Sequence, residues 1–173
     1  MEIERKFLIK NLPIDINSYP HYDIEQGYIL TNPVLRVRKA NDKYVFTYKS
    51  KGMLSHEEIN VPIEREAYDK LLKKIEGKLI MKTRYKIPLK DILSEDEAKI
   101  DISSLFLELD FFKNVYDNGK ALILAEIEFP TEEIANKFCA PSFFSLDVTF
   151  DKKYHNNNMI NNWFFRFFIL TYY

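Results

Sequence analysis

The stretch Glu2-Ile3-Glu4-Arg5-Lys6-Phe7-Leu8-Ile9 begins the chain with charged side chains at alternate positions. Side chains two apart along a β-strand point to the same face of the sheet. A strand formed by this stretch would carry Glu2, Glu4 and Lys6 on one face, opposite Ile3 and Phe7. The alternation therefore predicts a strand with one charged face.

Further segments repeat this alternation, and each carries charge of one sign on one face. Three segments are basic, with Arg36 and Arg38, with Lys49 and Lys51, and with Lys82 and Arg84. Two segments are acidic, with Glu108 and Asp110, and with Glu126 and Glu128. Like charges repel when they are neighbours in a sheet, so a solvated face has no reason to collect them. The pattern favours basic and acidic walls around a shared interior, and an ordinary solvated face is the alternative for each strand taken singly.

The chain combines many short strands with few helices. Strands are predicted over residues 2–9, 24–30, 34–39, 43–51, 57–63, 79–87, 107–112, 122–129 and 146–151. Helices are predicted over residues 64–75 and from Thr131 to just before Pro141. Residues 94–97 are expected to form an exposed loop, and residues 99–102 are a candidate for a further strand. These elements predict an α+β fold without a domain boundary, a β-barrel or sandwich with covering helices.

Charged faces that point into a closed sheet carry a large desolvation cost unless the charges are paired or occupied. Such an interior should hold water and a strongly charged ligand. Lys and Arg suit phosphate oxygens, with Arg as the bidentate partner. Clustered carboxylates suit hard divalent cations such as Mg²⁺ or Mn²⁺. The residues alone therefore predict a site for a metal–polyphosphate complex.

The composition of the 173 residues excludes several classes of protein. A formal net charge of −1 lacks the basic excess of a general nucleic-acid binder. One cysteine excludes an internal disulfide framework and a multi-cysteine zinc site. The start of the chain shows no targeting signal, and the longest apolar stretch, residues 163–170, is too short to span a bilayer. We therefore expect a cytoplasmic location, with neither a membrane nor a nucleic acid as partner.

Several short motifs follow one another along the chain. The first is the ExExK pattern that begins at Glu2. It is followed by Gln26-Gly27-Tyr28, Arg36-Val37-Arg38, Lys49-Ser50-Lys51, Lys82-Thr83-Arg84, Glu126-Ile127-Glu128, and Asp147-Val148-Thr149-Phe150-Asp151 with Tyr154 and Asn156. This ordered set resembles the CYTH domain family, the triphosphate tunnel metalloenzymes. Because the resemblance covers about residues 2–158, residues 1–158 are expected to form the tunnel domain and residues 159–173 an aromatic tail of unclear role.

The resemblance implies a closed, antiparallel, eight-stranded β-barrel with a charged lumen and a few covering helices. It implies phosphate binding by Lys6, Arg36, Arg38, Lys49, Lys51, Lys82 and Arg84. It implies metal binding, with Mg²⁺ or Mn²⁺, by Glu2, Glu4, Glu126 and Glu128, and a catalytic role for Lys6, Arg36 and Glu128. Glu58, Glu108 and Asp110 are weaker metal-ligand candidates. Asn60 stands where the family often has a second acid, and Asp101 competes for the acidic pair before the last ExE motif.

The activity implied by the resemblance is metal-dependent hydrolysis of inorganic tripolyphosphate or a small organic triphosphate. Two alternatives stay open: a class IV adenylate cyclase and a non-catalytic module that binds polyphosphate or a nucleotide. The cyclase is less favoured because the sequence shows no adenine-reading motif. Asn60 favours the non-catalytic module, because it weakens the ligand set for a second metal. The sequence leaves the oligomeric state open, with a homodimer as one candidate assembly.

Overall fold

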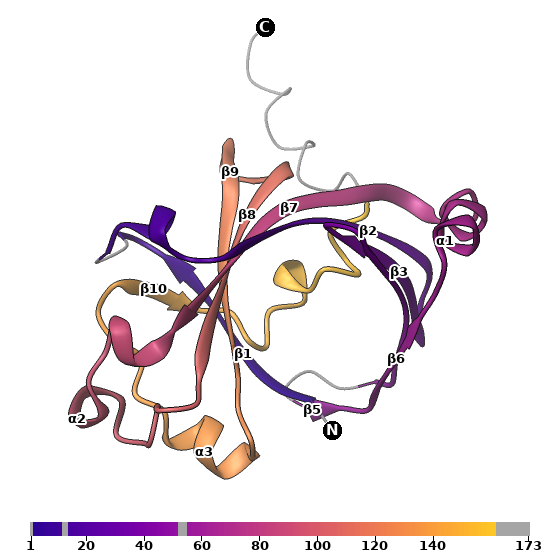
Figure 1. Cartoon of the computed structure of the whole chain (residues 1–173). Coiled ribbons are helices and arrows are strands. Elements are labelled where there is room, and N and C mark those ends of the chain that lie inside the picture. Colours follow the sequence, from indigo (N-terminus) through magenta and orange to yellow (C-terminus); the bar gives the residue numbers. More distant parts are fainter. Residues whose placement is uncertain (1, 12–13, 52–54, 162–173) are drawn as a thin grey trace, which may run out of the picture.

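The strands of the protein form one antiparallel sheet in the computed structural model, which describes residues 2–11, 14–51 and 55–161 (Figure 1). The strands are β1 (Glu2–Ile9), β2 (His21–Thr31), β3 (Val34–Ala40), β4 (Lys43–Lys49), β5 (Ser55–His56), β6 (Glu58–Pro62), β7 (Glu76–Pro88), β8 (Phe106–Asp117), β9 (Lys120–Glu128) and β10 (Phe144–Asp147). The α-helices are α1 (Arg65–Leu72), α2 (Glu95–Ala98) and α3 (Glu132–Lys137). Short 3₁₀ helices are η1 (Ile16–Ser18), η2 (Leu89–Asp91) and η3 (Lys152–Tyr154). The described chain is therefore an α+β protein, as the sequence predicted.

The sheet does not close into the predicted eight-stranded barrel. Its hydrogen-bonded path runs β10-β1-β9-β8-β7-β2-β3-β4-β6 and does not return from β6 to β1. The reason lies in the edge of β1 that faces away from β9, which is divided between two partners. Residues 7–9 pair with β10, whereas Glu2 and Ile3 pair with the two residues of β5. Within the described residues, the two ends of the sheet are thus bridged by a two-residue ladder and not by a full strand pair.

The register of the sheet aligns the charged positions of neighbouring strands. Glu4 and Lys6 of β1 lie opposite Glu128 and Glu126 of β9. Glu126 also lies opposite Glu108 of β8. Directly opposed residues in an antiparallel pair share a face and approach to about 5 Å. The period-two pattern along each strand therefore becomes a continuous charged surface across the sheet.

The helices lie on the outside of the curved sheet, with α1 at one side and α2 and α3 at the other (Figure 1). Helix α1 contacts β2, β3 and β4 and ends at Leu72, slightly earlier than the sequence predicted. Helix α3 begins after Thr131, whose hydroxyl accepts a hydrogen bond from the Ile134 N–H. These two predicted helices are confirmed.

Residues 94–102 differ from the prediction of a loop followed by a strand. Ser94 and Glu97 form a capping box, which satisfies the first N–H groups and allows the short helix α2 to form. Lys99 then ends α2 in the left-handed conformation, with φ of 61°. Residues 99–105 contain no strand, and β8 begins at Phe106. The sequence carries the Ser-x-x-Glu pattern of a capping box, but four consecutive polar residues also fit an exposed loop.

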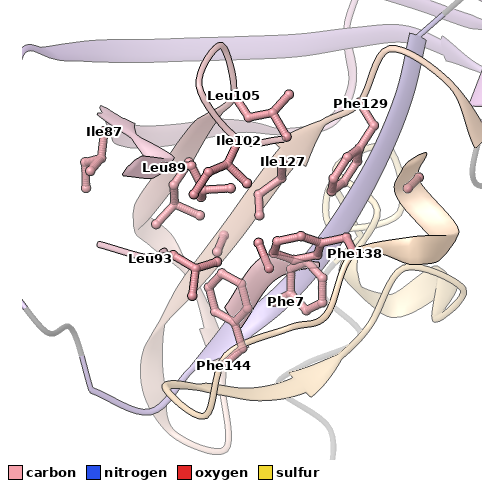
Figure 2. Close-up of a cluster of buried hydrophobic side chains, with 14 of the residues drawn as sticks. Phe7, Ile87, Leu89, Leu93, Ile102, Leu105, Ile127, Phe129, Phe138 and Phe144 are labelled. Atoms are coloured by element: carbon pink, nitrogen blue, oxygen red, sulfur yellow. The ribbon is translucent and has the colours of Figure 1, made fainter. Parts of the chain in front are cut away.

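Apolar side chains form two clusters. The first joins Ile3 and Phe7 of β1 to β7, β8, β9 and α3 (Figure 2). Within it the rings of Phe7 and Phe144 stack with centroids 4.5 Å apart. The second cluster contains Tyr28, Ile80, Phe112, Val115, Leu122, Leu124, Val148, Tyr154, Met159 and Ile160.

The final described residues bear on the predicted aromatic tail. Met159 and Ile160 are buried in the second cluster, and the Ile160 carbonyl accepts a hydrogen bond from the Lys78 N–H. Residues 162–173, which make up most of the predicted tail, lie outside the described residues. No helix among the described residues is both long enough and apolar enough to cross a lipid bilayer.

Candidate phosphate and metal site

The charged face of the sheet lines a small cavity of about 50 Å³. The lining residues come from strands β1 to β9, β5 excepted, and from the loop after η3. They are Glu2, Glu4, Lys6, Gln26, Arg36, Arg38, Lys49, Glu58, Lys82, Arg84, Glu108, Glu126, Glu128 and Asn156. The sequence reasoning placed all of these charged residues in one site, and the structure brings them together.

Two predicted site residues lie elsewhere. Lys51 lines a larger neighbouring cavity of about 540 Å³. Asp110 is completely buried behind the wall, where it accepts hydrogen bonds from Lys82 and Arg84. Its position orients the two cations and leaves it outside the lining of both cavities. Asp101, the competing candidate, is exposed and bonds the backbone N–H of Ser103.

Ion pairs connect the acidic and basic parts of the small cavity. The Lys6 ammonium lies 2.5 Å from a Glu126 carboxylate oxygen and 2.8 Å from Glu4. On the opposite side, the Lys49 ammonium lies 2.6 Å from Glu2 and also pairs with Glu58. In this arrangement, carboxylates neutralise much of the positive charge that would otherwise face the cavity.

A third group of ion pairs centres on Arg84. Its guanidinium holds Asp110 in two hydrogen bonds of 2.6 Å, lies 2.5 Å from Glu126 and also pairs with Glu108. These carboxylates raise the pKa of Arg84 further, against the opposing effect of burial. Lys82 lies 2.5 Å from Asp110, yet burial and the nearby Arg84 lower the pKa of Lys82 to about 8. Repulsion and burial therefore outweigh the single ion pair of Lys82.

Arg36 and Arg38 on β3 have a different environment. Neither forms an ion pair with a carboxylate of the described residues, and the Nε atom of each is buried without a hydrogen-bond partner there. Arg36 is 6% exposed and donates a hydrogen bond of 3.2 Å to the Thr47 hydroxyl. Burial lowers the pKa of Arg38 to about 10, helped by repulsion from Arg36 and Arg84. Both guanidinium groups therefore keep N–H donors that an anion could engage.

The acidic residues create the opposite imbalance at Glu128. Burial raises the pKa of the Glu128 carboxyl, and repulsion from Glu2, Glu108, Glu4 and Glu58 raises it further. Glu128 forms no ion pair with the described residues, unlike Glu4, whose pKa is lowered by Lys6 despite burial. A cation beside Glu128 would relieve this repulsion.

The donor set fits a hard divalent cation in its chemistry, because it consists of carboxylate oxygens around a repelling centre. Among the residues that the structure describes, however, no three His, Cys, Asp or Glu side chains are gathered as a group that could hold a metal ion. Most of these carboxylates are already ion-pair partners of Lys6, Lys49 or Arg84. Metal binding at this site would therefore require an exchange of partners.

Several neutral site residues were not assigned roles from the sequence. Thr47 on β4 donates a hydrogen bond of 2.7 Å to the Asn60 amide oxygen, and Asn60 donates one of 2.5 Å to Glu58. Together with the bond from Arg36, these contacts join Arg36 to Glu58. Thr47 stands two positions before Lys49, so the same period-two argument places it on the charged face.

Gln26, Tyr28 and Asn156 also belong to the cavities, although they entered the sequence argument only as parts of motifs. The Gln26 amide donates a hydrogen bond of 3.1 Å to the Tyr28 hydroxyl. Burial raises the pKa of Tyr28 to about 12, so its hydroxyl stays protonated. Asn156 lines both cavities. Neutral amides and hydroxyls carry no charge pattern, which is why alternation alone did not single them out.

Comparisons with known proteins agree with this geometry. The CYTH domain matches residues 1–134. An inorganic triphosphatase from Nitrosomonas europaea is 36% identical over 160 residues, which cover 90% of this chain and 93% of that protein. An inorganic triphosphatase from Acetivibrio thermocellus is 30% identical over 170 residues, covering 93% and 94% of the two chains. A crystal structure of an inorganic triphosphatase has a TM-score of 0.62 and 31% identity, covering 92% of this chain and 94% of that one.

Proposed function

Because this chain belongs to the CYTH domain family, we propose that it is a metal-dependent hydrolase of inorganic tripolyphosphate or a small organic triphosphate. Water would split a phosphoanhydride bond, so that tripolyphosphate yields orthophosphate and pyrophosphate. The names of the two bacterial relatives support this reaction. We further propose a cytoplasmic location and a small-molecule triphosphate as the partner, while the homodimer stays a prediction.

The observation that carries the proposal is the pair of arginines on β3. The buried Arg36 and the half-buried Arg38 bring two guanidinium groups, without carboxylate partners among the described residues, to one small cavity. Guanidinium groups form charge-assisted, bidentate hydrogen bonds with phosphate oxygens. An anion with several charged oxygens would compensate both groups at once, whereas chloride or a single carboxylate would compensate only part of this charge.

The remaining cations would join the phosphate contacts by exchanging partners. Lys6, Lys49, Lys82 and Arg84 would turn from carboxylates to phosphate oxygens, while Lys51 would contact the part of the substrate in the larger cavity. Transfer of a phosphoryl group needs mainly positioning and neutralisation of charge. In this proposal, Lys6 and Arg36 neutralise the transferring phosphoryl group and Glu128 lies on the metal side of the reacting centre.

The carboxylates released by this exchange would hold the divalent metal, Mg²⁺ or Mn²⁺. Glu2, Glu4, Glu126 and Glu128 are the proposed ligands, with Glu58 and Glu108 as further candidates. When bound, the metal would neutralise phosphate charge and lower the pKa of a bound water. Asp110 is a positioning residue for Lys82 and Arg84 in this proposal, because it lines neither cavity.

The lining of the larger cavity favours an inorganic substrate over a nucleotide. Its described residues are mainly lysines, asparagines and hydroxyl-bearing side chains, and its Tyr28 ring is only 2% exposed. An adenylate cyclase must also hold adenine and place the ribose hydroxyl in line with the α-phosphorus. An inorganic chain of phosphates needs only cations and hydrogen-bond donors, which this lining supplies.

The test is product analysis with tripolyphosphate, thiamine triphosphate and ATP, each with and without Mg²⁺ or Mn²⁺. We expect metal-dependent release of orthophosphate and pyrophosphate from tripolyphosphate and little or no cyclic AMP from ATP. Arg38→Ala should abolish most of the turnover, whereas Arg65→Ala on the exposed face of α1 serves as the matched control. Stoichiometric cyclic AMP would establish a cyclase instead, and tight binding without any turnover would establish a non-catalytic module.

A further inference from the structure

The loop after η3 is held in place by hydrogen bonds from its own side chains. The His155 Nε2 atom lies 3.0 Å from the Thr149 carbonyl oxygen. The amide groups of Asn157 and Asn158 donate to the carbonyl oxygens of Thr31, at 3.3 Å, and Lys152, at 2.8 Å. The buried Met159 follows directly. Three of the four side chains at positions 155–158 therefore fix the loop to its surroundings.

Asn156 is the residue of this loop that reaches the charged cavity. It lines both cavities together with Glu4, Lys6, Arg36 and Lys49, so it lies where the two cavities meet. Its Oδ1 atom is buried and has no hydrogen-bond partner among the described residues. The other residues shared by the two cavities are charged, and Asn156 is the neutral amide between them.

The missing partner of Asn156 Oδ1 must be a hydrogen-bond donor. A buried carbonyl oxygen that lacks a donor costs about 1–3 kcal/mol, so this position is expected to be filled when the site works. Phosphate oxygens of a fully ionised polyphosphate are acceptors and cannot fill it. Water can, because each molecule has two donor hydrogens, and the larger cavity offers water a route to this point.

We propose that Asn156 Oδ1 accepts a hydrogen bond from the water molecule that attacks the substrate, which makes Asn156 a catalytic residue of the hydrolysis proposed above. The inference rests on that proposed function. The water oxygen forms a bond to the terminal phosphorus, and the bridging P–O bond breaks with its electron pair on the departing pyrophosphate. One proton leaves the water and is taken up by the phosphate products. Asn156 does not accept this proton, because an amide is not a base at neutral pH, and acts only by orienting the water.

The test compares two substitutions at Asn156 with different expected consequences. Asn156→Leu keeps the approximate volume but removes the acceptor, so kcat should fall roughly 10- to 100-fold through loss of orientation. The affinity for tripolyphosphate, measured calorimetrically without metal, should change less than about threefold because no phosphate contact is lost. Asn156→Asp keeps an acceptor and adds a negative charge beside Glu4. Its kcat should stay within about threefold of the wild type, while its KM rises several-fold.

Asn17→Ala is the matched control, because it removes an amide hydrogen bond, to Asp15, at a residue that lines neither cavity. This variant should lower the melting temperature slightly and leave kcat within about twofold. If Asn156→Leu keeps wild-type kcat while the wild type hydrolyses tripolyphosphate, the inference fails and the proposed function stands. Equal losses of metal-free affinity and of kcat/KM in Asn156→Leu would assign Asn156 to a phosphate contact and also overturn the inference. A wild type that binds tripolyphosphate without hydrolysing it would overturn both.

Discussion

Replacing Arg38 by methionine should stabilise the free protein and weaken its binding of triphosphate. Burial and the neighbouring Arg36 and Arg84 lower the pKa of Arg38 to about 10, which corresponds to about 3 kcal/mol against its charged form. Methionine keeps most of the apolar stem and removes this cost. After allowance for lost contacts of the guanidinium, we expect a gain of about 1–3 kcal/mol in the free energy of unfolding. For a chain of this length the gain equals roughly 2–10 °C in melting temperature.

The measurement is thermal unfolding followed by circular dichroism at pH 7, with and without tripolyphosphate. Lys39→Met is the matched control, because Lys39 is the next residue of β3 and points to the other face of the sheet. That variant should stay within about 0.5 kcal/mol of the wild type. Tripolyphosphate should raise the melting temperature of the wild type and of Lys39→Met more than that of Arg38→Met. A melting temperature of Arg38→Met clearly below that of Lys39→Met would show that Arg38 is stabilised by its surroundings, contrary to our reasoning.

Four further substitutions test separate parts of the site. Glu128→Gln should abolish most metal-dependent turnover without loss of stability. Glu126→Gln should also destabilise the fold by roughly 3–5 kcal/mol, because it removes the charged partner of two cations, Lys6 and Arg84. Metal titration measures the loss of turnover in both variants, and urea unfolding distinguishes them by stability. Thr47→Val should cost about 1 kcal/mol of stability. It should also weaken triphosphate binding a few-fold, because Arg36 loses the hydroxyl that holds it. An unchanged affinity in calorimetry would show that Thr47 does not position Arg36 for the triphosphate. Burial lowers the pKa of His155 in the folded protein, and the charge of Lys6 lowers it further. At pH values between this lowered pKa and the usual value near 6.5, the unfolded chain therefore binds more protons at His155 than the folded protein does. Stability should therefore fall as the pH drops through about 6.5, and His155→Gln should flatten this part of the curve measured by denaturant unfolding.

The sequence predicted the charged face because that face obeys a simple rule of strand geometry. Residues such as Arg36 and Arg38 share a face whatever the tertiary structure, and a face of like charges needs a ligand. The same rule placed Glu126 and Glu128 together. What alternation could not supply is which cation meets which carboxylate. That depends on the strand register, and it leaves Lys6 paired while Arg38 has no carboxylate partner among the described residues.

Alternation along single strands also could not predict whether the sheet closes or how deeply Asp110 is buried, because both depend on how the strands pair. Closure depends on how two distant segments divide the edge of β1, and the two residues of β5 give no pattern long enough to detect. Asp110 carries the expected charge on the expected strand, but its depth is set by the bonds it accepts from Lys82 and Arg84. Neutral residues such as Asn156 join the site through a loop, where side-chain direction follows no period.

The alternation in β1 also limits where the chain can tolerate inserted or deleted residues. Alternate residues of β1 serve the cavity, as Lys6 does, or the first apolar cluster, as Ile3 and Phe7 do. Inserting or deleting a single residue within this strand would exchange the two sets, because a shift of one position turns every following side chain to the other face. Single-codon insertions and deletions in this part of the gene should therefore be far more harmful than point substitutions. Length variation among natural relatives should accumulate in the connections, such as residues 10–20 before β2, where no such alternation has to be preserved.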